Sequence, residues 1–325
     1  MGRKIERHLM KHRLFYNCLA AAALLMSLTA CGDKPGANVG TSSDSGKPRV
    51  FTVNYPLTYF AERIGGEAIE VVFPAPAEGD PAFWQPTEND IAAFQSADLI
   101  LRNGADYAKW MQGASLPESV QVDTSATFAD SLIVVAGTAT HSHGAGGEHS
   151  HDGVAFTTWL DLGQAIQQAQ AIRDAFVGRW PDQTSAFDAN FSALRADLEK
   201  LDGDLAFAAQ GFGKEPLAAS HPVYQYLARR YGLKIRSVLW EPETVPDDAA
   251  MADLKALLEK HPAKLMIWEG DPAPDSVAKL DAIGIKSVVF DPCGNRPEAS
   301  SDFLSVMREN IKRLAAAVPP VSPQP

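Results

Sequence analysis

Histidine side chains give the strongest chemical signal in this sequence. Four of the eight histidines, His141, His143, His149 and His151, fall in one short stretch where no apolar residue is larger than alanine. Such a segment cannot pack a core, and neutral imidazoles are common ligands of divalent transition metals. We expect residues 140–152 to form a His-rich loop that captures metal ions near a binding site. A solvated polar loop without a ligand is the alternative.

A fifth histidine stands among carboxylates at predicted strand ends. His221, Glu241, Glu269 and Asp291 each follow a predicted strand in the second half of the chain. Open parallel sheets bind ligands outside the carboxyl ends of their strands. One imidazole and three carboxylates suit zinc, manganese or iron(II) better than calcium, which prefers oxygen ligands only. For each glutamate alone, capping a helix or loop is at least as good an explanation.

The elements that must position these side chains come from an internal repeat. Two copies of one pattern align at an offset of 166 residues without a gap, through the pairs Pro56 and Pro222, Gly66 and Gly232, Val72 and Val238, Pro76 and Pro242, Ala97 and Ala263, Leu99 and Leu265, and Gly104 and Gly270. Each copy is predicted to alternate strands with helices. Such alternation predicts an α/β fold in which two pseudo-repeated lobes contain parallel sheets flanked by helices.

The segments of the two copies can be read individually. Strands are expected at residues 50–53, 69–73, 98–102 and 120–122, and again at 216–219, 235–239, 264–268 and 288–290. Helices are expected at residues 57–64, around 88–95, at 223–231 and at 248–260.

One long helix is predicted to join the lobes. Residues 162–179 show helical spacing, Pro181 interrupts it, and residues 184–209 continue with a stripe formed by Phe187, Phe191, Leu194, Leu198, Leu201 and Leu205. A helix of about 26 residues would extend about 39 Å, which is long enough to run along both lobes. We expect the stripe to be ordinary core packing.

The amino terminus reads as a targeting segment. A basic start is followed by a short apolar stretch that is too short to span a bilayer, which is typical of a secretory signal peptide. The stretch ends in Leu28-Thr29-Ala30-Cys31, which resembles a bacterial lipobox and implies lipidation of Cys31. An ordinary signal peptide with an incidental cysteine is the alternative.

Composition limits the partners. The chain has 325 residues and a net charge of -11, and the acidic balance argues against nucleic acid binding. Cys293 would be the only unmodified thiol after processing, so we expect a buried core residue. We expect a monomer with residues 1–30 as signal peptide, 31–48 as flexible tether, 49–180 as N-terminal lobe, 181–211 as connecting helix, 212–317 as C-terminal lobe and 318–325 as Pro-rich tail.

The repeat, the long helix and the His-rich loop together resemble the zinc/manganese (cluster A-I) solute-binding lipoproteins of metal ABC transporters. The resemblance covers about residues 50–314 and is carried by Asp80-Pro81-Ala82-Phe83-Trp84-Gln85-Pro86-Thr87, Thr158-Trp159-Leu160-Asp161, Ser220-His221-Pro222 and Asp291-Pro292. It implies two lobes that bind a divalent cation between them and hand it to a membrane permease. His221 and Asp291 match ligand positions of that family.

The sequence departs from the family at two ligand positions. The family usually has histidine where Ala82 and Thr157 stand here. By the resemblance, Glu241, Glu269 or the loop histidines fill the vacancies, while Asp80, Phe83 and Trp84 line the opposing wall of the cleft.

The resemblance implies an extracytoplasmic, membrane-anchored protein that captures Zn²⁺, or else Mn²⁺ or Fe²⁺, for an ABC importer. One alternative is a binding protein for a chelated metal or a small organic solute, and another is a structural or adhesive lipoprotein of the same fold. We do not expect an enzyme, because we find no catalytic triad, phosphate loop or paired catalytic carboxylates.

Overall fold

The computed structural model describes residues 46–135, 140–142, 148–150 and 153–318, and it contains two four-stranded sheets. The first sheet has the order β2-β1-β3-β4 and the second sheet the order β10-β9-β11-β12, with every pair parallel. Their bounds are β1 Arg49–Thr52, β2 Glu70–Val72, β3 Leu99–Arg102, β4 Gln121–Asp123, β9 Pro216–Ala219, β10 Lys234–Ser237, β11 Leu265–Trp268 and β12 Lys286–Val289. The two copies of the sequence repeat therefore fold into sheets with the same strand order.

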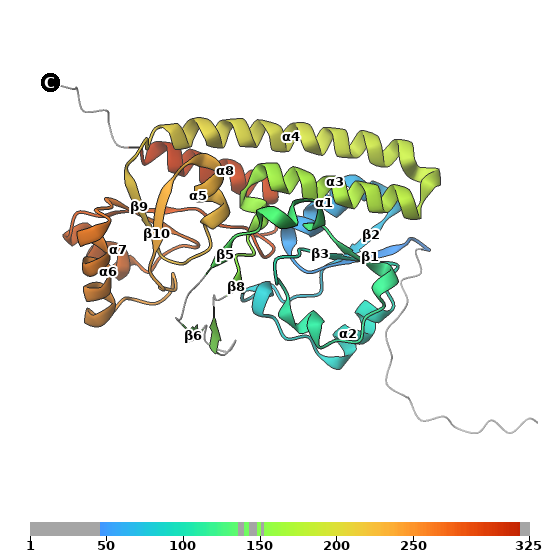
Figure 1. Cartoon of the computed structure of the whole chain (residues 1–325), viewed down its shortest axis with the longest axis horizontal. Helices are drawn as coiled ribbons and strands as arrows, with labels where there is room; N and C mark the ends of the chain where they lie inside the picture. The colour runs from blue at the N-terminus through green and yellow to red at the C-terminus, as the bar shows by residue number, and fades with distance from the viewer. Residues whose placement is uncertain (1–45, 136–139, 143–147, 151–152, 319–325) are drawn as a thin grey trace, which may run out of the picture. The chain divides into compact units, whose positions relative to one another are not determined.

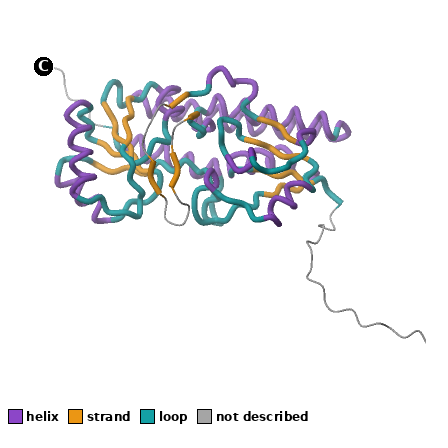
Figure 2. Tube along the Cα trace, turned by 60° about the horizontal axis from the view of Figure 1, so that its bottom comes forward, coloured by secondary structure: helices purple, strands orange, loops and turns teal. Residues whose placement is uncertain are grey.

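Helices flank both sheets, as Figure 2 shows. The α-helices are α1 Tyr55–Gly65, α2 Glu88–Gln95, α3 Leu162–Arg179, α4 Thr184–Gln210, α5 Gln225–Tyr231, α6 Asp248–Lys260, α7 Pro274–Ala282 and α8 Phe303–Ala316. Short 3₁₀ turns lie at Gly66–Ala68, Pro81–Phe83 (η2), Lys109–Gln112, Glu118–Val120, Ala126–Ser131, Thr158–Leu160 (η7) and Pro181–Gln183. The prediction of an α/β fold with parallel sheets flanked by helices is confirmed.

The long helix α4 packs along both halves of the fold (Figure 1). Its six predicted stripe residues are all buried. It contacts α1 and α3 beside the first sheet, and α5 and α8 beside the second. The helical conformation is interrupted between α3 and α4 at Trp180, which has φ -130° and ψ 66°. A residue that precedes proline is sterically excluded from the helical region, so Pro181 causes this break.

Several elements differ from the predicted bounds by one or two residues at an end, and two of them illustrate this. The helix expected from residue 223 begins at Gln225, because Val223 N–H donates to the carbonyl of His221 in a tight turn. The strand expected at 235–239 is β10, Lys234–Ser237. Two short antiparallel pairs were not predicted. β5 (Val134–Val135) pairs with β8 (Gly153–Val154), and β6 (Thr140–Ser142) pairs with β7 (Glu148–Ser150).

A set of side chain to backbone bonds joins the loop after β12 to the loop after β2. Asn295 Nδ2 lies 2.8, 3.0 and 2.9 Å from the carbonyl oxygens of Pro76, Ala77 and Gly79. Arg296 donates to the carbonyls of Phe73 and Ala75, and its guanidinium lies 4.4 Å from the centre of the Phe73 ring. We call these contacts of Asn295 and Arg296 the strap. The strap fixes the loop that leads to Asp80.

No helix among the residues that the structure describes is long and apolar enough to cross a membrane.

Candidate metal centre

Four strands of the second sheet deliver the predicted donors to one edge. His221 lies two residues after β9, Glu241 four residues after β10, Glu269 directly after β11, and Asp291 two residues after β12. Because all four strands are parallel, their carboxyl ends meet at the same edge of the sheet. The sheet therefore brings four separate segments of the chain to one place.

Three of these side chains come close enough to share an ion. His221, Glu241 and Glu269 each offer one ligand atom, and these atoms lie within 4.8 Å of one another. Ligands of tetrahedral zinc are held about 2.0–2.2 Å from the ion, and hence about 3.4 Å from one another. Small side-chain movements would therefore bring all three ligand atoms within reach of one ion.

His221 and Glu269 are also bonded to each other. His221 Nδ1 lies 2.7 Å from Glu269 Oε1, and the side chains are only 3% and 19% exposed. A carboxylate that accepts from one imidazole nitrogen fixes the ring orientation and leaves the second nitrogen as the better ligand. This pair can therefore act as two ligands, or as one ligand and the group that orients it.

Asp291 lines the same cavity but does not belong to the three-donor group. Its Oδ1 accepts from the Cys293 N–H at 2.6 Å, and its own N–H donates to Asn310. Burial raises the pKa of Asp291 above its usual range, the Cys293 N–H opposes that rise, and the nearby charge of Glu269 adds to it. A cation in the cavity would relieve the repulsion between these two carboxylates.

These side chains face a cavity of about 570 Å³ that is walled on the opposite side by residues from the first half of the chain. Asp80, Tyr107, Phe156, Thr157 and Trp159 contribute to that wall. Asp80 is therefore among the residues that line the large cavity.

Phe83 and Trp84 lie elsewhere. Phe83 lines a separate cavity of about 30 Å³, and Trp84 packs edge-on against Trp110, with ring centres 5.9 Å apart. Neither side chain is among the described residues that line the large cavity.

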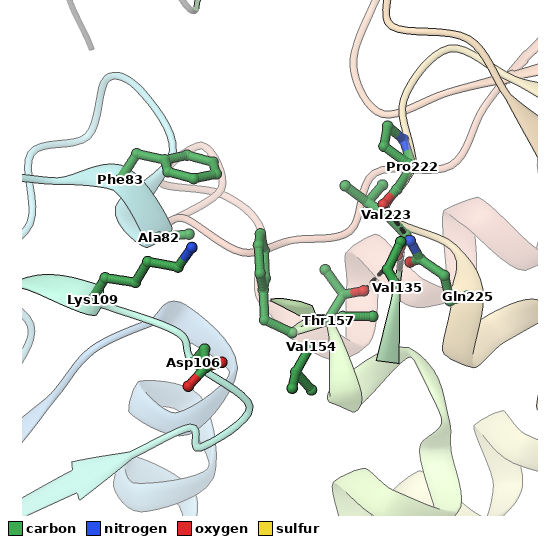
Figure 3. A pocket seen from close by; sticks show the side chains of 12 residues that line it. Ala82, Phe83, Asp106, Lys109, Val135, Val154, Thr157, Pro222, Val223 and Gln225 are labelled. Atoms are coloured by element: carbon green, nitrogen blue, oxygen red, sulfur yellow. Dashed lines mark hydrogen bonds between the residues drawn. The ribbon is translucent and has the colours of Figure 1, made fainter. Parts of the chain in front are cut away.

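The two positions where histidine is missing both line the smaller cavity, shown in Figure 3. Ala82 is buried, and the Thr157 hydroxyl donates to the carbonyl of Val223 at 2.5 Å. Figure 3 shows Ala82 and Phe83 on one side of this cavity, with Pro222 and Val223 on the other. The first half therefore offers no imidazole at these places.

The remaining predicted residues are less fully described. The β6–β7 pair places His141 directly opposite His149 in register. His143, His151 and Cys31 lie outside the described residues. Cys293 is buried as predicted, and burial raises the pKa of its thiol.

Sequence reasoning missed Tyr107 and Asn295 in the cavity wall. Tyr107 follows β3 by five residues, and Asn295 follows β12 by six. Both belong to loops that leave strand ends, so carrying the strand-end rule further along each loop could have found them.

The fold and the site define a class: α/β binding proteins with two related parallel sheets and an acidic, histidine-bearing cavity between their loops. The family model described as "Zinc-uptake complex component A periplasmic" matches residues 50–317, and the chain belongs to this family. The family is the one that the sequence resemblance predicted.

Individual relatives are distant. The "Zinc-binding lipoprotein AdcA" of Streptococcus pneumoniae (strain ATCC BAA-255 / R6) is 25% identical over 306 residues, which cover 91% of this chain and 59% of AdcA. The chain thus spans little more than half of that relative. The "High-affinity zinc uptake system protein ZnuA" of Bacillus subtilis (strain 168) is 27% identical over 314 residues, which cover 90% of this chain and 94% of ZnuA.

A solved structure shows the same fold. The Zn(II)-bound ZnuA-like domain of Streptococcus pneumoniae AdcA has a TM-score of 0.71 at 22% identity, and the match covers 84% of this chain and 99% of that domain.

Proposed function

We propose that the chain captures a divalent transition metal ion, zinc first and manganese or iron(II) second, and delivers it to an ABC importer. The observation that carries this proposal is the group of His221, Glu241 and Glu269, whose ligand atoms lie within 4.8 Å of one another at the edge of the second sheet. One nitrogen and two oxygen ligands suit these ions.

The charge of the cavity supports the capture of a cation. Its described lining includes five carboxylates, those of Asp80, Glu241, Glu243, Glu269 and Asp291, and no lysine or arginine. A cleft lined by one sign of charge concentrates ions of the opposite sign. The half-buried carboxylates of Glu241, Glu269 and Asp291 also repel one another until a cation binds, so the ion would be held by both coordination and relief of repulsion.

We further propose that the protein works outside the cytoplasm, as the description of its family supports. Removal of residues 1–30 would leave Cys31 as the lipid-bearing amino terminus, and residues 32–48 as a tether to the membrane. Such an anchor keeps the binding protein close to its permease.

Zinc binding by the processed chain, residues 31–325, tests this function. We expect metal analysis after loading and desalting to find tightly held zinc. His221→Ala should reduce the zinc affinity of the tight site by more than about 100-fold, because loss of a metal ligand reduces affinity more than loss of a residue that only hydrogen-bonds a ligand. His261→Ala is the matched control, since His261 Nε2 bonds the carbonyl of Leu217 and does not line the cavity. Equal zinc retention by His221→Ala and wild type would refute the assignment.

A second candidate function is the binding of a chelated metal, which the cavity volume of about 570 Å³ favours over a bare ion. The acidic lining would require a neutral or cationic chelator. Thermal-shift measurements with zinc alone and with zinc–histidine separate the two. A larger shift with the complex favours the chelate.

A further inference from the structure

A strained turn presents one tyrosine to the metal cavity from the wall opposite His221. After β3 the chain passes through Ala105, Asp106 and Ala108, whose φ values are 51°, 57° and 54°. Non-glycine residues rarely adopt such left-handed conformations, and those that persist cluster at functional sites. The turn places Tyr107 in the cavity wall.

The Tyr107 ring is rigidly held, but its hydroxyl is not satisfied. The ring packs edge-on against Phe156 and Trp159, with centres 5.4 and 5.9 Å away, and the residue is 7% exposed. The hydroxyl is buried and has no hydrogen-bond partner among the described residues. A buried donor without an acceptor destabilises the protein, so its persistence calls for an acceptor in another state.

The Asp80 side chain lines the same cavity as Tyr107. Its carboxylate is exposed at the cavity and interacts electrostatically with Tyr107. Burial raises the pKa of Tyr107 well above its ordinary value, and the Asp80 charge adds to this rise. Asp80 Oδ1 accepts from the Ala82 N–H at 2.8 Å, while the strap holds the preceding loop.

We propose that Asp80 is the metal ligand supplied by the wall opposite His221, and that Tyr107 is the positioning residue that donates a hydrogen bond to the Asp80 carboxylate when the ion is bound. This inference rests on the proposed metal-binding function. It goes beyond it by making the site span both sheets, although the first-half histidine positions hold Ala82 and Thr157.

The coordination chemistry supports a fourth ligand from that wall. His221, Glu241 and Glu269 leave one position of a tetrahedral site open. Asp80 and Asp291 both accept from a backbone N–H and both lie outside the three-donor group, but only Asp80 comes from the first half of the chain. Asp80 is exposed to the cavity and belongs to the opposite wall, so its carboxylate can meet an ion already held by the second sheet.

Zinc dissociation rates of four processed chains test this proposal by chelator challenge: wild type, Tyr107→Phe, Asp80→Asn and the double variant. Asn preserves the cap on Ala82 but removes the anionic ligand. We expect Tyr107→Phe to raise the dissociation rate about tenfold, and Asp80→Asn up to about 100-fold. Because Tyr107 acts through Asp80, the double variant should lose zinc no faster than Asp80→Asn alone.

The stability of the metal-free protein distinguishes positioning from ordinary packing. Tyr107→Phe removes an unpartnered hydroxyl, so the melting temperature of the metal-free protein should stay equal or rise by about 2 °C. Tyr226→Phe is the control: its hydroxyl donates to the carbonyl of Ala155 at 2.8 Å, so this variant should melt lower and release zinc at the wild-type rate.

Three outcomes would overturn the proposal. A Tyr107→Phe protein that releases zinc at the wild-type rate removes the role of Tyr107. Multiplicative effects of Tyr107→Phe and Asp80→Asn in the double variant show that Tyr107 does not act through Asp80. A wild-type chain that holds no zinc refutes the proposed function itself, and this inference with it.

Discussion

The pair of His221 and Glu269 shows how one contact can serve both the empty and the loaded protein. A buried imidazole without a partner would be unstable, and the 2.7 Å contact with Glu269 provides that partner. The same carboxylate holds the ring in one orientation before an ion arrives. Preorganisation of this kind improves metal affinity because the His221 side chain loses no further conformational freedom when the ion binds.

Removing the negative charge of Glu269 should therefore reduce zinc affinity more than it reduces folding stability. We expect Glu269→Gln, which keeps the shape, to reduce zinc affinity about 10–100-fold, as measured by competition with a chromogenic chelator. Asp271→Asn is the control, since this carboxylate is exposed, lies two residues further on and does not line the cavity. Equal losses from both substitutions would mean that bulk charge, and not the contact with His221, governs affinity.

At the scale of elements, the alternating pattern and the repeat predict nearly all of the framework. Bounds at 162–179 and 248–260 agree with α3 and α6. The strand-end rule also finds His221, Glu241 and Glu269, because parallel topology alone brings strand ends together.

Side-chain directions outside the strand ends were not predictable in the same way. Trp84 belongs to the same motif as Asp80, yet it turns away to pack against Trp110. Tyr107 reaches the cavity through a left-handed turn of non-glycine residues, a conformation that residue types do not signal.

The junction of α4 and α5 carries a titratable contact. Asp202 on α4 accepts from the Arg230 guanidinium and, at 2.8 Å, from the Tyr231 hydroxyl. Burial alone would raise the pKa of Asp202, but the hydrogen bonds from Arg230 and Tyr231 outweigh it and lower the pKa below its ordinary value of 3.8. The folded state therefore favours the charged form more than the unfolded chain does.

This contact gives acid-dependent stability. Its contribution is complete above pH 3.8, the unfolded value, and disappears as the pH falls through the lower folded value. We expect Asp202→Asn to melt about 2–4 °C below wild type at neutral pH. The difference in melting temperature should shrink as the pH falls below 3.8. A gap that stays constant down to about pH 2 would show that Asp202 acts by packing rather than by charge.

At the scale of the whole described body, two separate features tie the sheets together. α4 is a 27-residue helix that contacts helices beside both sheets. The strap adds direct bonds from Asn295 and Arg296 to the loop at residues 73–79. Hinged closure would have to bend the helix and break the strap.

Loading with zinc should therefore change the scattering profile very little. We expect small-angle X-ray scattering to give radii of gyration with and without zinc that agree to within about 0.5 Å. The reason is that hinge closure needs a few loop residues that can change conformation, whereas the continuous helix α4 runs beside both sheets. The Asn295→Ala protein, which lacks half of the strap, should show a larger change. A contraction of the wild type by about 1 Å or more would contradict this picture.

Under the proposed function, the helix and the strap also determine how this protein can select its ion. A receptor that closes around its ligand can reject a wrong ion by failing to close, but a body held at two places must discriminate by coordination chemistry alone. Imidazole and carboxylate ligands bind copper(II) more tightly than zinc, whatever the protein around them. Under the proposed function, the ion that is carried then depends on which ions surround the protein. Excess copper would act as a competitor that fills the cavity, and the same rigidity that keeps the ligands ready would leave the protein without a structural means to refuse it.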